Sequence, residues 1–186
     1  EDVDLVSIDF EKINELSIVG NESSRRLGVL KSLLFSMEYY VLENTFNLYI
    51  IDDVNRQLKD FKEKMYTEEY TLDYSRIGEI IIDLEEKFEE RYNLLLQNEG
   101  GEKIRMPLQI VVINSKEAIE YISSNKQILE RYNKLVKQYK ALGISFIYSN
   151  IEDVNVPYGA PEILKRQKEN KKVLITTSKL KDFKFC

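Results

Sequence analysis

The chain of 186 residues has no histidine, no tryptophan and only one cysteine, Cys186. Without histidine and with a single thiol, it lacks the usual zinc ligands and the base of Ser-His and Cys-His nucleophilic catalysis. A single cysteine also excludes an internal disulfide framework and favours a reducing, cytosolic setting. No apolar run approaches the length that spans a bilayer, and no signal peptide is recognisable. We therefore predict no metal site and no catalytic residue in this chain.

The chain has many charged residues, and those of opposite sign are distributed unevenly along it. Residues 1–102 carry 11 basic and 24 acidic side chains, whereas residues 103–186 carry 16 basic and 8 acidic ones. This asymmetry favours stacking against neighbouring domains or a charged partner, although solvated helix faces that happen to differ explain it equally well. The basic residues lie at helical spacing, without glycine-rich or aromatic stacking motifs, so we predict no nucleic-acid partner.

The segment 16–34 has the outline of a phosphate-binding strand, loop and helix. A P-loop reads G-x-x-x-x-G-K-[ST] between a buried strand and a helix. Gly20 supplies the first glycine of that motif. The remaining positions, in chain order, are taken by Asn21, Glu22, Ser23, Ser24, Arg25, Arg26 and Leu27. The frame of the motif is present, but its second glycine, its lysine and its hydroxyl are all replaced.

Each replacement removes part of the chemistry of nucleotide binding. Arg25 at the second glycine position is sterically costly where backbone N–H groups must close around phosphates. The planar fork of Arg26 is no substitute for a compact lysine ammonium, and Leu27 offers no oxygen to magnesium. Glu22 places a carboxylate where phosphate charge belongs, and we hypothesise that it fills the anion hole from within. These positions therefore predict a degenerate P-loop that does not cleave nucleotide.

A second segment is altered in a similar way. Residues 107–113 form a buried-strand run that a Walker B motif would end with an acidic pair, which holds magnesium and the attacking water. The two positions are occupied by Asn114 and Ser115, neither of which is charged. The alternative is that neither segment is a nucleotide site, each being only a hydrophobic strand followed by a helix.

The order of apolar patterns predicts an α/β fold. Strands are expected near residues 15–19, 48–51, 109–113, 144–148 and 173–176, with helices over 27–42, 75–98, 116–141 and 160–168. Residues 4–10 alternate and could pair with 15–19 as a hairpin at the sheet edge. Such alternation of strands and helices indicates a mostly parallel central sheet with helices on both faces, in one domain covering 1–186. Binding sites in such sheets lie at the carboxyl ends of the strands, where both altered motifs fall.

Taken together, these motifs resemble an FtsK/SpoIIIE-type ATPase domain, which has a RecA-like P-loop NTPase fold. The resemblance rests on the strand 48–52, the Leu-x-x-Phe of residues 58–61, the helix ending in residues 89–92 and the strand from Pro107. It covers about Val6 to Phe185, and the loss of both Walker motifs is most similar to the last of the tandem ATPase domains in the membrane-bound motor of Gram-positive type VII secretion. One departure is the segment 149–153, which has no arginine where the family places one.

The resemblance implies a C-terminal, cytoplasmic domain of a longer bacterial cell-membrane protein. Its implied partners are secreted substrates such as WXG100-like proteins, neighbouring ATPase domains of the same chain, and copies of the parent in an oligomer. It implies no cofactor for this domain, with ATP and magnesium serving only its neighbours. The expected function is substrate binding or regulation of those neighbours without hydrolysis. The alternative is a weak nucleotide-binding or ATPase domain of an FtsK-type translocase, with Arg26 on the phosphates.

Overall fold

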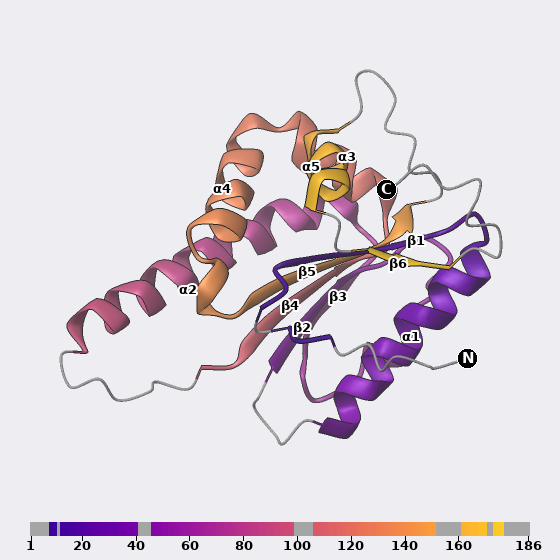
Figure 1. Cartoon of the computed structure of the whole chain (residues 1–186), viewed down its shortest axis with the longest axis horizontal. Coiled ribbons are helices and arrows are strands. Elements are labelled where there is room, and N and C mark those ends of the chain that lie inside the picture. Colours follow the sequence, from indigo (N-terminus) through magenta and orange to yellow (C-terminus); the bar gives the residue numbers. More distant parts are fainter. Residues whose placement is uncertain are drawn as a thin grey trace, which may run out of the picture.

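The computed structural model describes residues 8–10, 12–40, 46–98, 106–151, 161–170 and 173–176. Its centre is a six-stranded, all-parallel sheet with strand order β3-β2-β4-β5-β1-β6 (Figure 1). The strands are β1 (Glu15–Val19), β2 (Phe46–Ile51), β3 (Thr67–Thr71), β4 (Leu108–Ile113), β5 (Ile144–Ile151) and β6 (Val173–Ile175). The parallel arrangement confirms the predicted α/β fold class.

Helices cover both faces of the sheet (Figure 1). One face carries α2 (Ile77–Gln97), α3 (Lys116–Ser124), α4 (Lys126–Lys137) and α5 (Glu162–Asn170). The other carries α1 (Ser23–Tyr40) and the short 3₁₀ helix η1 (Lys59–Phe61). Two further 3₁₀ turns, η2 (Tyr74–Arg76) and η3 (Lys140–Leu142), lead into α2 and β5.

The strand sequences explain why both faces are buried. In β4, Ile110 and Val112 pack on the α1 side, while Val111 and Ile113 pack on the α2 side. Because successive side chains of a strand point to opposite faces, an unbroken apolar run is what a strand covered on both sides requires. The apolar stripe of α2, with Ile77, Ile80, Ile81, Leu84 and Phe88 buried, packs onto one of these faces.

Two expectations need correction. Residues 15–19 do not form a hairpin edge, because β1 lies inside the sheet and pairs in parallel with β5 and β6. Most of its expected hairpin partner, residues 4–7, lies outside the described residues. The strand β3 was not expected, because its sequence Thr-Glu-Glu-Tyr-Thr is polar. No residue of β3 is fully buried, so this strand does not need the apolar run of the central strands.

An ion-pair cluster joins α2 to α4. Glu85 is 9% exposed and pairs with Lys134 at 2.9 Å and with Arg131. Burial by itself raises the pKa of Glu85, but the hydrogen bonds and charges of Lys134 and Arg131 outweigh burial, so its pKa lies below the ordinary value of 4.5. The folded state therefore favours the ionised carboxylate.

This cluster predicts a pH-dependent stability. A carboxylate with a lowered pKa stabilises the fold above about pH 4.5, and this contribution is lost as the pH falls through the folded-state pKa. We expect Glu85→Gln to lower the free energy of unfolding at pH 7 by roughly 1–2 kcal/mol, with the difference from wild type shrinking in acid. Urea unfolding between pH 7 and pH 3 measures this difference. Glu86→Gln, at the exposed neighbouring residue, is the control, and an equal loss in both variants would contradict the prediction.

Candidate functional site

The candidate site lies along the carboxyl edge of the sheet. Four neighbouring strands, in the order β2, β4, β5 and β1, end here. They bring together Asp52 after β2, Asn114 after β4, Ser149 near the end of β5, and Gly20 after β1. Asp52, Asn114 and Ser149 are all buried polar residues, with exposed fractions of 0%, 4% and 2%. Polar groups removed from water to this degree need hydrogen-bond partners.

Arg26 supplies the cation of this edge. It lies in the first turns of α1 and is only 2% exposed. Its Nε donates to the carbonyl oxygen of Ser149 at 3.0 Å, and its Nη1 donates to the carbonyl oxygen of Gly20. The guanidinium thus bridges the ends of β1 and β5. Arg26 occupies the lysine position of the P-loop frame, but two of its nitrogens donate to the chain's own backbone.

Gly20 is required by packing. A Cβ atom at this position would lie 2.1 Å from Oγ1 of Thr176, which follows β6. Thr176 also donates from its backbone N–H and its hydroxyl to the carbonyl oxygen of Val19, at 2.8 and 3.1 Å. The end of β6 therefore packs against the loop, and any side chain at position 20 would displace Thr176.

Asn114 and Ser149 continue the hydrogen-bonded chain across the sheet. The Ser149 hydroxyl donates to Oδ1 of Asn114, and Nδ2 of Asn114 donates to Oδ1 of Asp52 at 2.9 Å and to Oε1 of Gln57 at 3.1 Å. An amide both accepts and donates, so Asn114 can join a hydroxyl to a carboxylate, which an acidic residue at its position could not do while ionised.

Asp52 ends this chain. Its two oxygens accept from the backbone N–H of Asp53 and of Leu58, from the hydroxyl of Tyr70 at 2.8 Å and from Asn114. Burial and the hydrogen bond to Asp52 raise the pKa of Tyr70, so its phenol stays protonated and donates. The Asp52 carboxylate therefore caps the turn that follows β2.

The four donors on Asp52 make its replacement costly. In Asp52→Asn, one acceptor oxygen becomes an NH₂ group that faces other donors. We expect the free energy of unfolding to fall by about 2 kcal/mol, since a buried donor is left without a partner. Chemical denaturation measures the loss. Asp53→Asn, one residue along at a partly exposed position, is the control. Equal stability of Asp52→Asn and wild type would show that the carboxylate is not needed.

Ser115 also has a local structural function. Its hydroxyl accepts from the backbone N–H of Ala118 at 3.2 Å and caps the first turn of α3, while donating to Glu117 at 2.9 Å. Serine at this position is a preferred helix N-cap. Both residues at the Walker B positions are thus engaged within the protein.

The remaining residues of the P-loop frame lie outside the buried network. Asn21, Ser23 and Ser24 are exposed. The carboxylate of Glu22 is 55% exposed and pairs with Arg25 at 2.8 Å, so the hypothesis that Glu22 fills the anion hole is wrong: the buried group behind the loop is Arg26. Leu27 packs against the core between α1 and the sheet.

These residues do not fit a magnesium nucleotide. In P-loop proteins, a hydroxyl and an acidic residue hold the magnesium ion. The phosphates are bound by backbone amides and a lysine. Here Leu27 replaces the hydroxyl, Asn114 replaces the acid, and Arg26 donates to carbonyl oxygens. Among the described residues, no group of three or more acidic or cysteine side chains is placed to hold a metal ion.

Comparisons with known proteins find similarity in structure but not in sequence. No protein-family model matches the sequence, and no curated protein is significantly similar to it. In structure the chain is similar to the cytoplasmic domain of EssC (TM-score 0.73, 17% identity, covering 94% of this chain and 34% of that one). It is also similar to ATPases 2 and 3 of Thermomonospora curvata EccC in complex with a signal sequence peptide (TM-score 0.68, 16% identity, 91% and 31% covered).

A third similar structure is EssC, ATPases 2 and 3, from Geobacillus thermodenitrificans (TM-score 0.68, 17% identity, 95% and 34% covered). This chain therefore spans about a third of the length of these three solved chains. The similarity confirms the expected resemblance at the level of the fold. Within the part of the chain that the structure describes, no helix is long and apolar enough to cross a membrane.

Proposed function

We propose that this chain is a non-hydrolysing, ATPase-like domain of a type VII secretion motor, which binds secreted substrates or regulates neighbouring ATPase domains. The observation that carries the proposal is the buried Arg26, whose guanidinium bonds the carbonyl oxygens of Gly20 and Ser149. A lysine in that position of an active P-loop would be available to phosphate. A domain whose own side chains complete this edge can keep its shape without nucleotide.

The similar structures support the proposed partners and location. One of them, EccC, is described in complex with a signal sequence peptide, which supports secreted, WXG100-like proteins as partners of this chain. Another, of EssC, is a cytoplasmic domain, which supports the same location for this chain, within a membrane-bound parent. ATP and magnesium then serve the neighbouring domains, and the parent acts as an oligomer. The net charge of −5 supports the absence of nucleic acid from this list.

A second candidate is a weak nucleotide-binding domain. Arg26 keeps a positive charge within the frame, and its two carbonyl partners could be exchanged for phosphate oxygens. This exchange must break two buried hydrogen bonds and also leaves magnesium without its usual ligands.

Calorimetric titration with magnesium and a non-hydrolysable ATP analogue separates the two candidates. We expect no binding up to millimolar analogue, and no phosphate release from ATP. The triple variant Arg25→Gly, Arg26→Lys, Leu27→Ser restores the motif and tests whether these three positions alone prevent binding. Micromolar affinity of the wild type would overturn the proposal in favour of the second candidate.

Substrate binding is tested by pull-down. The chain is immobilised and offered C-terminal peptides of WXG100-like proteins, with double-stranded DNA at several salt concentrations as the comparison. Saturable peptide binding without DNA binding supports the proposal. Retention of DNA that weakens steeply with salt would instead indicate a DNA translocase subunit.

A further inference from the structure

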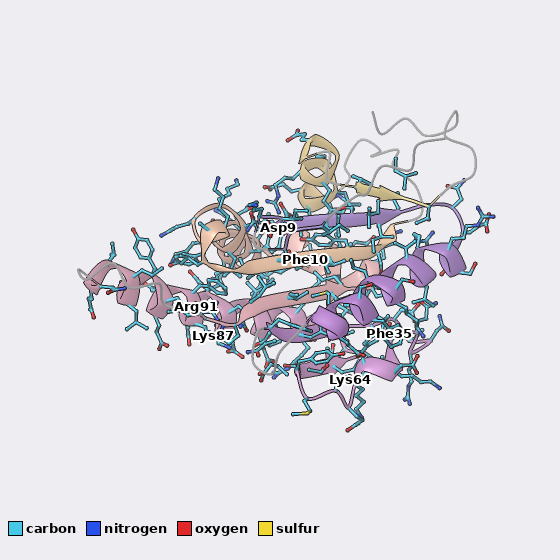
Figure 2. All side chains as sticks on the ribbon, turned by 60° about the horizontal axis from the view of Figure 1, so that its bottom comes forward. Asp9, Phe10, Phe35, Lys64, Lys87 and Arg91 are labelled. Atoms are coloured by element: carbon cyan, nitrogen blue, oxygen red, sulfur yellow. The ribbon has the colours of Figure 1, made fainter. Side chains whose placement is uncertain are left out.

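The last turns of α2 extend beyond the body of the protein (Figures 1 and 2). The helix is held to the body at Arg91, which is 6% exposed and is labelled in Figure 2. Its guanidinium donates to the carbonyl oxygens of Pro107 at 2.7 Å and Leu142 at 3.2 Å, and lies 4.7 Å from the centre of the Phe88 ring. After this anchor, the side chains of α2 are mostly solvent-exposed.

These exposed side chains are unusually apolar. Tyr92 is 39% exposed, Leu94 51%, Leu95 41% and Leu96 65%, and we call these four residues the leucine end. Three consecutive leucines, at 100° per residue, spread over more than half of the helix circumference. A helix segment with so much exposed apolar surface is normally buried, and full burial of one leucine is worth about 1.5–3 kcal/mol. The leucine end is therefore suited to contact with an apolar surface of a partner.

An acidic stripe leads along the same helix to the leucine end. Asp83, Glu86 and Glu90 are all exposed and follow one another at steps of three and four residues, and Leu94 continues the series. Residues at these spacings share one face of a helix. The surface thus combines an apolar tip with a negatively charged approach.

This combination of an apolar tip and an acidic stripe argues against two kinds of partner, a second copy of the chain and an anionic membrane. Two copies of the chain that paired through their leucine ends would bring their acidic stripes together, which is repulsive. In a head-to-tail contact, the leucine end of one copy would bind an exposed apolar site on the basic half of the other copy, residues 103–186. The exposed large hydrophobic residues described all precede residue 97, so the described residues offer no such site. Membranes with anionic lipids would repel the stripe as well.

We propose that the leucine end and the acidic stripe form a docking surface for a protein partner that presents an amphipathic helix, with an apolar face flanked by lysine and arginine. Burial of the leucines supplies the affinity, and the stripe orients the partner and accelerates its approach. The surface is separate from the carboxyl edge of the sheet, so this proposal stands or falls independently of nucleotide binding.

The test uses a fluorescein-labelled amphipathic helical peptide of leucine and lysine as probe, with a leucine–glutamate peptide of equal length as control. Fluorescence anisotropy gives the affinity, and ¹⁵N chemical-shift mapping of the whole chain locates the bound peptide. We expect the lysine peptide to bind and to shift the amides of the second half of α2. The variants Leu94→Gln/Leu96→Gln and Glu86→Lys/Glu90→Lys should each weaken binding by about tenfold or more.

Glu63→Lys/Glu68→Lys is the matched control, because it makes the same change in net charge at exposed residues on another part of the surface. It should bind within about twofold of wild type. The proposal is overturned if the control loses as much affinity as the two α2 variants, if the wild type does not bind, or if the shifts lie elsewhere. Dimerisation that Leu94→Gln/Leu96→Gln abolishes, or co-sedimentation of the wild type with anionic vesicles, would overturn it in favour of a second copy or a bilayer.

Discussion

Arg26→Ala should lower the free energy of unfolding by about 2–4 kcal/mol, the combined effect of a large-to-small change in a buried site and the loss of buried hydrogen bonds. The side chain is almost fully buried, and its removal leaves the carbonyl oxygens of Gly20 and Ser149 without these donors. Urea unfolding followed by circular dichroism measures the loss. The expected size is large because Arg26 joins α1 to two strand ends at once.

The neighbouring arginine provides the control. Arg25 is 49% exposed and pairs with Glu22 on the surface, so Arg25→Ala should cost less than about 0.5 kcal/mol. Arg26→Met separates volume from hydrogen bonding, because it restores much of the packing without a donor. If Arg25→Ala and Arg26→Ala destabilise equally, the bridging function of Arg26 is refuted.

Arg166→Met should be the most destabilising single change, by about 3–5 kcal/mol, because it removes the cation that pairs with a buried carboxylate. Arg166 in α5 donates to Glu15 in β1 through Nη2 at 3.0 Å, and both side chains are at most 14% exposed. Its guanidinium also lies 4.8 Å from the ring of Tyr132, whose hydroxyl donates to Glu15. Burial raises the pKa of Tyr132 well above its usual value, so this phenol stays protonated and remains a donor.

A double-mutant cycle tests this interpretation. Glu15→Gln/Arg166→Met removes both charges and should recover part of the stability lost in Arg166→Met, since no buried charge is left unpaired. The free energy of unfolding of the four proteins gives the coupling. Additive effects of the two single changes would mean that Glu15 and Arg166 do not interact as the structure indicates.

Much of the fold could be predicted because its central elements have strong periodic patterns. The apolar stripe of α2 and the unbroken apolar run of β4 indicated a helix and a doubly covered strand. The edge strand β3 was missed because two of its five residues are glutamates. The hairpin expected at residues 15–19 was wrong because an alternation of apolar and polar residues does not identify the partner of a strand. The strand that pairs with these residues, β5, lies about 130 residues away in the sequence.

The two altered motifs lie at the carboxyl ends of β1 and β4, as the strand pattern predicted, but the contacts within this edge were not predicted. Arg26 was noted as the replacement of a lysine, whereas the filling of the loop was assigned to Glu22. One signal could have identified Arg26: it lies four and eight residues before Leu30 and Leu34, on the stripe of α1 that is buried. Ser149 gave no such signal, because a serine at a strand end is usual on a surface.

A crystal structure of the chain grown with magnesium and a non-hydrolysable ATP analogue at millimolar concentration would show whether the loop can hold a nucleotide. We expect the Arg26 guanidinium to remain between the carbonyl oxygens of Gly20 and Ser149, Asn114 to remain bonded to Asp52, and no nucleotide to lie over the loop. Phosphates bound by the backbone amides after Gly20, with Arg26 turned toward them, would contradict this expectation.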